Sequence, residues 1–220
     1  MPDKLNKNFQ TCIFDFDGVI IDSEPLHAEA KQITLDHFLI ECPSAVLAKF
    51  KGRTDVDFFD YVSREVVQGK FTPEELGAFK IREYLRLFEE VPLIDGIQNF
   101  LGFARKRFKK LGLATSATKR DFSLAAQKYQ LQAWFDVIVT GEDTINHKPH
   151  PEPYLKAISK LSTPVDEILV IEDSPNGIKS AKAANCTVVG ITTGFESQEL
   201  YSAGADMVVT SFSEIEQGLK

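Results

Sequence analysis

Short apolar runs alternate with longer amphipathic stretches along most of this chain, and this alternation constrains the fold more than any other feature. The apolar runs have the length of buried strands and cover residues 11–15, 111–116, 136–140, 167–173 and 187–191. Between them, helical patterns cover residues 96–109, 119–130, 151–160 and 175–185. Strands that alternate with helices predict an α/β fold, a three-layer, Rossmann-like, doubly wound parallel sheet.

Residues 22–90 break this alternation, because several amphipathic helical patterns follow one another there with no convincing strand between them. Within this block, Thr72, Pro73 and Glu75 form a helix-start signal. We therefore expect an all-helical cap inserted into the Rossmann-like domain. The expected bounds are 1–21 and 91–220 for the core and 22–90 for the cap.

The composition argues against several classes of protein. The 220 residues carry a formal net charge of -7 at pH 7, which repels the phosphate backbone of nucleic acids. The three cysteines are scattered, with neither a zinc pattern nor a disulfide framework. The first ten residues lack the apolar segment of a signal peptide, and no apolar run is long enough to span a bilayer. We expect a cytoplasmic protein that binds neither nucleic acid nor membranes and is a monomer rather than an oligomer.

Acidic residues stand at the carboxyl ends of two predicted strands. Asp15 and Asp17 end the first strand, and Glu172 and Asp173 end the fourth. Open parallel sheets bind ligands beyond the carboxyl ends of their strands, so these side chains are candidates for one site. Taken alone, such residues are equally typical of turns and helix caps. If all four converge, they cannot all stay ionised without a cation, and magnesium is the expected ion.

A hydroxyl and an ammonium group complete the candidate site. Thr115 and Ser116 end the second predicted strand, and Lys119 follows where a helix N-terminus could cradle an anion. Lys148 lies in a proline-rich segment that restricts the backbone, and a rigidly held ammonium group suits a phosphate. The alternatives are a helix cap for Ser116 and a solvated loop charge for Lys148.

Taken together, these segments resemble the haloacid dehalogenase superfamily, and within it the group that contains β-phosphoglucomutase and phosphoglycolate phosphatase. The four motifs of that superfamily occur here in order, as DFDGVIIDSEPLH at 15–27, ATSATK at 114–119, the Lys148-Pro149 pair and IEDSPNGIKSAKAAN at 171–185. The resemblance covers nearly the whole chain.

The resemblance implies a magnesium-dependent phosphatase that hydrolyses small phosphomonoesters, such as a sugar phosphate or a phosphoglycolate-like metabolite, through a phospho-aspartate intermediate. Asp15 would be the nucleophile and Asp17 the general acid and base, while Ser116 and Lys148 would hold the phosphoryl group. Carbon–halogen hydrolases of the superfamily generally lack an acid at the position of Asp17, so its presence favours phosphoryl transfer.

The resemblance also implies a metal site with Mg²⁺ as cofactor. Asp15 and Asp173 would contribute carboxylates, and Asp17 would contribute its main-chain carbonyl. Glu172 occupies a position at which family members place an acid beside the metal, either as a direct ligand or behind one.

Two other functions stay open. A sugar phosphomutase of the β-phosphoglucomutase type is suggested by Ser23 and His27, which stand where that mutase has its hinge hydroxyl and a cap histidine. Against it, Asp55 stands where the mutase carries an arginine for a second phosphate, and Arg53 resembles the phosphatase version of this loop. Arg53 and His27 are therefore candidate substrate-binding residues. Lys80 could also contribute from the third cap helix, or it could belong to a solvated helical face together with Arg82 and Arg86. The second of these functions is the binding of phosphorylated ligands without catalysis, by an inactive member of the superfamily.

Overall fold

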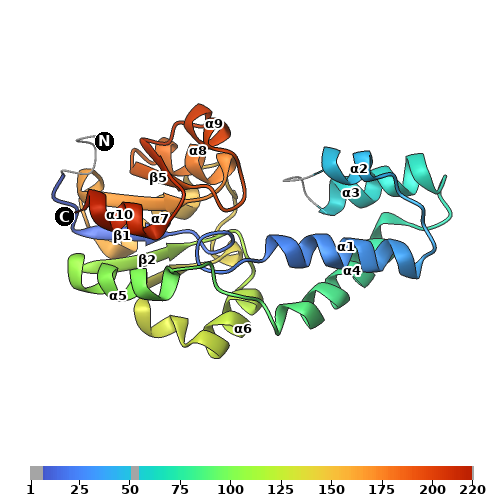
Figure 1. Ribbon diagram of the computed structural model, residues 1–220, viewed down its shortest axis with the longest axis horizontal. Coiled ribbons are helices and arrows are strands. Elements are labelled where there is room, and N and C mark those ends of the chain that lie inside the picture. The colour runs from blue at the N-terminus through green and yellow to red at the C-terminus, as the bar shows by residue number, and fades with distance from the viewer. Residues whose placement is uncertain (1–6, 51–54, 220) are drawn as a thin grey trace. The chain divides into compact units, whose positions relative to one another are not determined.

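A parallel sheet of six strands organises the computed structural model, which describes residues 7–50 and 55–219 (Figure 1). The strands lie in the order β3-β2-β1-β4-β5-β6. Their bounds are β1 (Thr11–Phe14), β2 (Lys110–Ala114), β3 (Val137–Val139), β4 (Ile168–Glu172), β5 (Thr187–Ile191) and β6 (Met207–Val209). The predicted α/β fold is confirmed, and the predicted strands are β1 to β5.

Helices cover both faces of this sheet. They are α5 (Ile97–Arg107), α6 (Lys119–Tyr129), α7 (Glu152–Leu161), α8 (Pro175–Ala183), α9 (Ser197–Ser202) and α10 (Phe212–Gly218). The sequence patterns did not predict β6, α9 or α10. Each of these elements has seven residues or fewer, and such a length is too short for a periodic apolar pattern to stand out.

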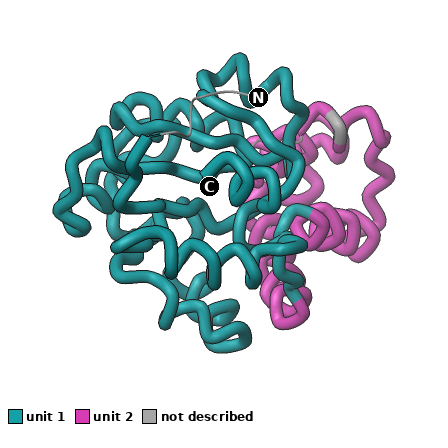
Figure 2. The backbone as a smooth tube through the Cα atoms, turned by 60° about the vertical axis from the view of Figure 1, so that its left-hand side comes forward, with its two compact units in different colours: residues 1–24, 91–220 teal, residues 25–90 magenta. Residues whose placement is uncertain are grey.

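The chain divides into two compact units, a core of residues 1–24 and 91–220 and a cap of residues 25–90 (Figure 2). Two backbone hydrogen bonds join the segments of the core that precede and follow the cap. Asp22 N donates to Pro92 O at 2.9 Å, and Ile94 N donates to Ile20 O at 3.0 Å. The points where the chain leaves and re-enters the core are thus held side by side.

The described residues of the cap form helices and loops without a strand. The helices are α1 (Glu24–His37), α2 (Ser44–Lys49), α3 (Asp55–Tyr61), a π-helical turn (Val62–Val66) and α4 (Pro73–Phe88). Their apolar side chains bury one another in a separate cluster that includes Leu35, Phe58, Phe59 and Leu76. None of the helices in the described ranges combines the length and apolar character that crossing a membrane requires.

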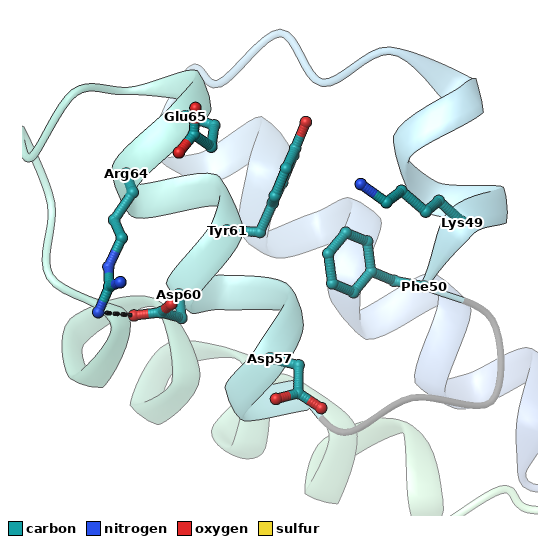
Figure 3. A pocket seen from close by; sticks show the side chains of 7 residues that line it. All are labelled: Lys49, Phe50, Asp57, Asp60, Tyr61, Arg64 and Glu65. Atoms are coloured by element: carbon teal, nitrogen blue, oxygen red, sulfur yellow. Dashed lines mark ion pairs between the residues drawn. The ribbon is translucent and has the colours of Figure 1, made fainter.

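A hollow of about 400 Å³ lies on the cap (Figure 3). It is lined by Lys49, Phe50, Asp57, Asp60, Tyr61, Arg64 and Glu65. Two of its cations already have partners within the cap, because Arg64 pairs with Asp60 at 2.9 Å and the Lys49 ammonium lies 4.9 Å from the ring centre of Tyr61. The lining contains no residue that the motifs identify as chemical, so we assign no function to this hollow.

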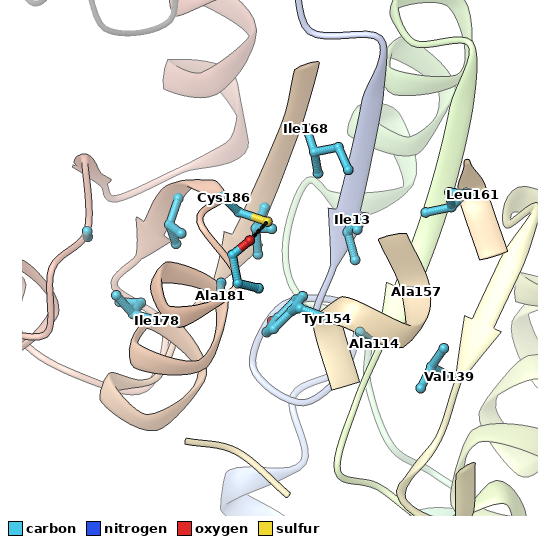
Figure 4. Packing of buried hydrophobic residues seen from close by; sticks show 14 of the residues in the cluster. Ile13, Ala114, Val139, Tyr154, Ala157, Leu161, Ile168, Ile178, Ala181 and Cys186 are labelled. Carbon is cyan, nitrogen blue, oxygen red and sulfur yellow. Dashed lines mark hydrogen bonds between the residues drawn. The ribbon is translucent and has the colours of Figure 1, made fainter. Parts of the chain in front are cut away.

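The sheet is buried on both faces, which explains why its strands read as continuous apolar runs. On one face, Ile13 packs with Tyr154 of α7 and Ile178 of α8 in a single apolar cluster (Figure 4). On the other face, the ring of Phe14 meets that of Phe100 of α5, with 6.0 Å between centroids. Strand β1 is therefore fixed from both sides, and so is the backbone that follows it.

The helix-start signal at Thr72 is confirmed as a capping box at the start of α4. The Thr72 hydroxyl accepts a hydrogen bond from Glu75 N at 3.2 Å, and the Glu75 carboxylate accepts one from Thr72 N at 2.8 Å. Pro73 occupies the first turn of α4. Backbone N–H groups there have no intrahelical acceptor, so the absence of an N–H group in proline costs no helical hydrogen bond.

We expect Thr72→Ala to lower the free energy of unfolding by about 1 kcal/mol, because the substitution removes the side-chain acceptor of a helix N-terminus. Urea titration monitored by circular dichroism measures this difference. Thr72→Ser keeps the hydroxyl and serves as the matched control, so it should stay near the wild-type value. Equal stability of the alanine variant and the wild type would contradict a stabilising cap.

Candidate active site

The strand order brings the sequence motifs to one edge of the sheet. Strand β1 lies between β2 and β4, and Asp15 N extends the β1–β4 pairing by donating to Ile171 O at 3.0 Å. A pocket of about 220 Å³ opens beyond these strand ends. It is lined by Asp15, Asp17, Glu24, Thr115, Ser116, Lys148, Asp173, Ser174, Asn176 and Phe195.

Lys148 links the nucleophile candidate to the fourth strand. Its ammonium group lies 2.7 Å from Asp15 Oδ1 and 2.6 Å from Glu172 Oε1, and its side chain is 7% exposed. Burial disfavours the charged form, but the two carboxylates outweigh this effect and raise the pKa of Lys148. The alternative of a solvated loop charge is therefore wrong for this residue.

Glu172 is completely buried and surrounded by donors. Its Oε1 accepts hydrogen bonds from Lys148 Nζ at 2.6 Å and from the Tyr154 hydroxyl at 2.7 Å. Its Oε2 accepts from Asp173 N at 3.1 Å and from the main-chain N and the hydroxyl of Ser174, both at 3.2 Å. Five donors saturate a carboxylate, which offers about four lone-pair positions.

Asp173 differs from its neighbour Glu172, because no hydrogen-bond donor in the described part of the chain contacts its carboxylate. Ligand oxygens of Asp15, Glu172 and Asp173 nevertheless lie within 4.8 Å of one another, and all three residues are buried. Burial and the Glu172 charge raise the pKa of Asp15 to about 7, and the same two causes raise that of Asp173 well above its usual value. Clustered carboxylate oxygens that repel one another fit a hard divalent cation.

Glycines allow the backbone to approach Asp173 closely. Gly18 lies within the first motif and has φ +71°, and a Cβ atom there would lie 2.1 Å from Asp173 Oδ2. A Cβ atom on Gly194 would lie 2.7 Å from the same oxygen. Thr193 Oγ1 donates to Gly18 O at 2.5 Å and joins these two segments. Any larger side chain at position 18 would therefore displace the carboxylate.

Asp17 lines the pocket but stands outside the group of three acids. Its Oδ1 accepts a hydrogen bond from the Ser23 hydroxyl at 2.5 Å. Burial raises the pKa of Asp17 to about 6, although the bond from Ser23 opposes this rise. A carboxyl group with a pKa near neutrality can both give and take a proton under ordinary conditions.

The predicted hydroxyl and anion cradle are only partly present. Ser116 is exposed and lines the pocket, so its hydroxyl can meet a ligand. The first turn of α6 is capped by Thr118, whose hydroxyl accepts from Asp121 N at 3.1 Å. Lys119 N donates to the Glu142 carboxylate at 2.7 Å. This part of the expected cradle is wrong, because that N–H group already has an anionic partner.

The cap residues form a network of their own. The Lys80 ammonium contacts His27 Nδ1 at 2.7 Å and Asp55 Oδ2 at 2.6 Å, while Lys31 contacts Asp55 Oδ1 at 3.1 Å. His27 also stacks on Tyr84 with 4.1 Å between ring centroids. Of the two alternatives for Lys80, the solvated helical face is wrong, because its side chain is 2% exposed. Arg53, the other candidate substrate-binding residue of the cap, lies outside the described residues.

Comparison with known proteins identifies the family. The model of the haloacid dehalogenase-like hydrolases matches residues 12–191, more than half of the chain. This chain belongs to that family. The order of its motifs and the sheet that unites them are thus those of a haloacid dehalogenase-like hydrolase.

Relatives of this hydrolase include proteins named as phosphatases, and a solved structure has the same fold. It is 30% identical over 237 residues to glycerol-1-phosphate phosphohydrolase 1 of Saccharomyces cerevisiae, covering 97% of this chain and 87% of the relative. It is 29% identical over 203 residues to a phosphorylated carbohydrates phosphatase of Thermotoga maritima, covering 91% and 94%. A solved structure of a putative β-phosphoglucomutase from Thermotoga maritima is 27% identical, with a TM-score of 0.84 and coverage of 96% of this chain and 100% of that one.

Some residues of this hydrolase's site escaped the sequence analysis. Glu24, Asn176 and Phe195 line the pocket, and Tyr154 contacts Glu172 from the apolar core. Glu24 and Asn176 fall inside the quoted motifs 15–27 and 171–185 and could have been found there. No local pattern distinguishes Tyr154 from an ordinary apolar position of a helix.

The His27 contacts predict a pH dependence of stability. Burial and the Lys80 ammonium lower the pKa of His27 from 6.5 to about 3. Between these values the unfolded chain binds a proton that the folded chain does not, so the free energy of unfolding falls as the pH falls below 6.5. We expect the contribution of His27 to decline by about 1 kcal/mol per pH unit.

The comparison of His27→Gln with the wild type isolates this contribution, because glutamine does not titrate. Urea titrations between pH 7.5 and 5 measure both proteins. The wild type should lose more stability than the variant on acidification. Parallel pH profiles would show that His27 is not held in the neutral form.

Proposed function

We propose that this protein is a magnesium-dependent phosphatase that hydrolyses small phosphomonoesters through a phospho-aspartate on Asp15. One observation carries the proposal: the Asp15 carboxylate lies at the end of the central strand, paired with Lys148 on one oxygen, and opens into a pocket with Ser116 and Asp173. Membership of a hydrolase family and relatives named as phosphatases support it.

The reaction begins with in-line attack of an Asp15 carboxylate oxygen on phosphorus, which forms the phospho-aspartate and breaks the bond to the ester oxygen. Asp17, in its protonated form, gives its proton to the departing alkoxide. The Asp17 carboxylate then takes a proton from water, whose oxygen attacks phosphorus and releases phosphate and the Asp15 carboxylate. Lys148 and Ser116 hold the phosphoryl oxygens throughout.

The metal would be held by the carboxylates of Asp15 and Asp173 and by the main-chain carbonyl of Asp17. When bound, Mg²⁺ neutralises charge on the phosphoryl oxygens and orients the phosphoryl group. Glu172 has no oxygen without a donor, since Lys148, Tyr154 and the backbone after β4 contact both. We therefore assign Glu172 to holding Lys148 rather than to direct ligation.

Hydrolysis is favoured over the mutase alternative by the charges of the cap. The mutase uses an arginine, three residues after the glycine of its cap loop, to bind a second phosphate. Asp55 stands at that position, and its carboxylate pairs with Lys31 and Lys80. A carboxylate fixed there by two ammonium groups offers no site for a second phosphate. The relatives named as phosphohydrolases and phosphatases agree with this preference.

We expect phosphate release from one or more of phosphorylated carbohydrates, glycerol phosphates and phosphoglycolate in the presence of Mg²⁺, measured by a colorimetric phosphate assay. Asp15→Asn should reduce release below detection, and Asp17→Asn should reduce it by about 10²–10⁴-fold. Parallel assays with β-glucose 1-phosphate and its bisphosphate activator test the mutase. Isomerisation without release would favour the mutase, and full activity of Asp15→Asn would refute the nucleophile assignment.

Removal of the metal should abolish turnover, and magnesium should restore it after treatment with a chelator. Asp173→Asn should raise the half-saturating Mg²⁺ concentration by more than about a hundredfold, beyond the effect of losing a residue that only supports a ligand. Glu172→Gln should raise it by less, because the donors around Glu172 occupy its oxygens. The opposite ranking of these two variants would make Glu172 the direct ligand.

A further inference from the structure

Tyr154 carries a hydroxyl group into the apolar core beneath the site. The residue is fully buried on α7, and its ring packs with Ile13, Ala157 and Ile178 (Figure 4). Packing alone would be satisfied by an apolar ring, and a buried phenol without a partner is destabilising. The hydroxyl finds that partner in Glu172 Oε1 at 2.7 Å.

Tyr154 is connected to Lys148 indirectly, through Glu172, and directly, through its ring. The oxygen that accepts its hydroxyl also accepts the Lys148 ammonium at 2.6 Å. In addition, the ammonium lies 4.9 Å from the centre of the Tyr154 ring, within the range of a cation–π interaction. Lys148 is thus bounded by the ring, by Glu172 and by Asp15, whose Oδ1 lies 2.7 Å away.

The hydroxyl affects one oxygen of Glu172 in particular. Oε2 is held by backbone N–H groups of Asp173 and Ser174, which connect β4 to α8. Oε1 has side-chain donors only, Tyr154 and Lys148. Without the hydroxyl, Lys148 would be the one remaining donor to Oε1 among the described residues, so Oε1 would be held less firmly and the ammonium could move toward Asp15.

We propose that Tyr154 is a positioning residue that sets the place of the Lys148 ammonium between Glu172 and Asp15. The hydroxyl fixes the acceptor, and the ring limits the space. The consequence for catalysis rests on the proposed phosphatase function, in which Lys148 holds the phosphoryl group. The position that Tyr154 gives to the Lys148 ammonium can be tested by phosphate binding alone.

The experiment compares Tyr154→Phe with the wild type by calorimetric titration with inorganic phosphate and Mg²⁺. Phenylalanine keeps the ring and its packing and removes the hydroxyl. We expect phosphate affinity to fall about tenfold, the size of one lost hydrogen bond to a charged group, and kcat to fall by a similar factor. Tyr129→Phe is the matched control, because it loses a 2.6 Å hydrogen bond to Val91 O and lines no part of the pocket.

A double-mutant cycle decides whether Tyr154 acts through Lys148. In a Lys148→Met background, which has no ammonium to position, Tyr154→Phe should change phosphate affinity no further. An equal loss in both backgrounds, or a loss no larger than that of Tyr129→Phe, would overturn the proposal. Melting temperatures of all variants check the fold. If Tyr154→Phe does not fold, Glu172→Gln in the same two backgrounds weakens the acceptor instead and should show the same coupling.

These outcomes remain separate from the proposed function. If the wild type hydrolyses no phosphomonoester, the phosphatase proposal fails, while the phosphate titrations still test the role of Tyr154. If hydrolysis is found and the cycle is additive, only the positioning role fails.

Discussion

The site depends on the Lys148 ammonium group, which two buried carboxylates share. Asp15 follows β1, Glu172 ends β4, and Lys148 comes from the loop before α7, so one cation joins three segments that are far apart in the chain. Removing one partner of such a buried group is costly, because it leaves an uncompensated charge in a medium of low dielectric. The pairing of β1 with β4 and the packing of α7 therefore also keep Asp15, Glu172 and Lys148 within ion-pair distance of one another.

The second constraint is the close approach of backbone to the carboxylates of Glu172 and Asp173. A Cβ atom on Gly177 would lie 1.8 Å from Glu172 Oε1, just as one on Gly18 would overlap Asp173. The two carboxylates are adjacent in sequence but differ in their surroundings, since donors saturate Glu172 and leave Asp173 without one among the described residues. A cation would relieve the repulsion at Asp173 and Asp15, where oxygens are still available.

The sequence predicted the strand ends well, because buried parallel strands produce apolar runs and polar residues directly after them stand out. Asp15, Ser116 and Asp173 could be identified in this way, and the family resemblance added their chemical roles. Tyr154 could not be identified and the role of Lys80 stayed open, since their importance arises from contacts with residues 18 and 25 positions away. A tyrosine on an apolar helix face and a lysine on an amphipathic helix look ordinary until the fold supplies their partners.

The networks of the two units differ in how far their charges are already satisfied. In the cap, the two carboxylate oxygens of Asp55 have ammonium partners in Lys31 and Lys80, and His27 accepts a contact from Lys80. In the core, Asp15 and Asp173 retain oxygens without a protein donor among the described residues. Replacing one member of the cap network would leave a buried charge without its partner, because the Lys80 side chain is 2% exposed. The carboxylate oxygens that remain for a cation are therefore those of Asp15 and Asp173 in the core, since both oxygens of Asp55 in the cap already have ammonium partners.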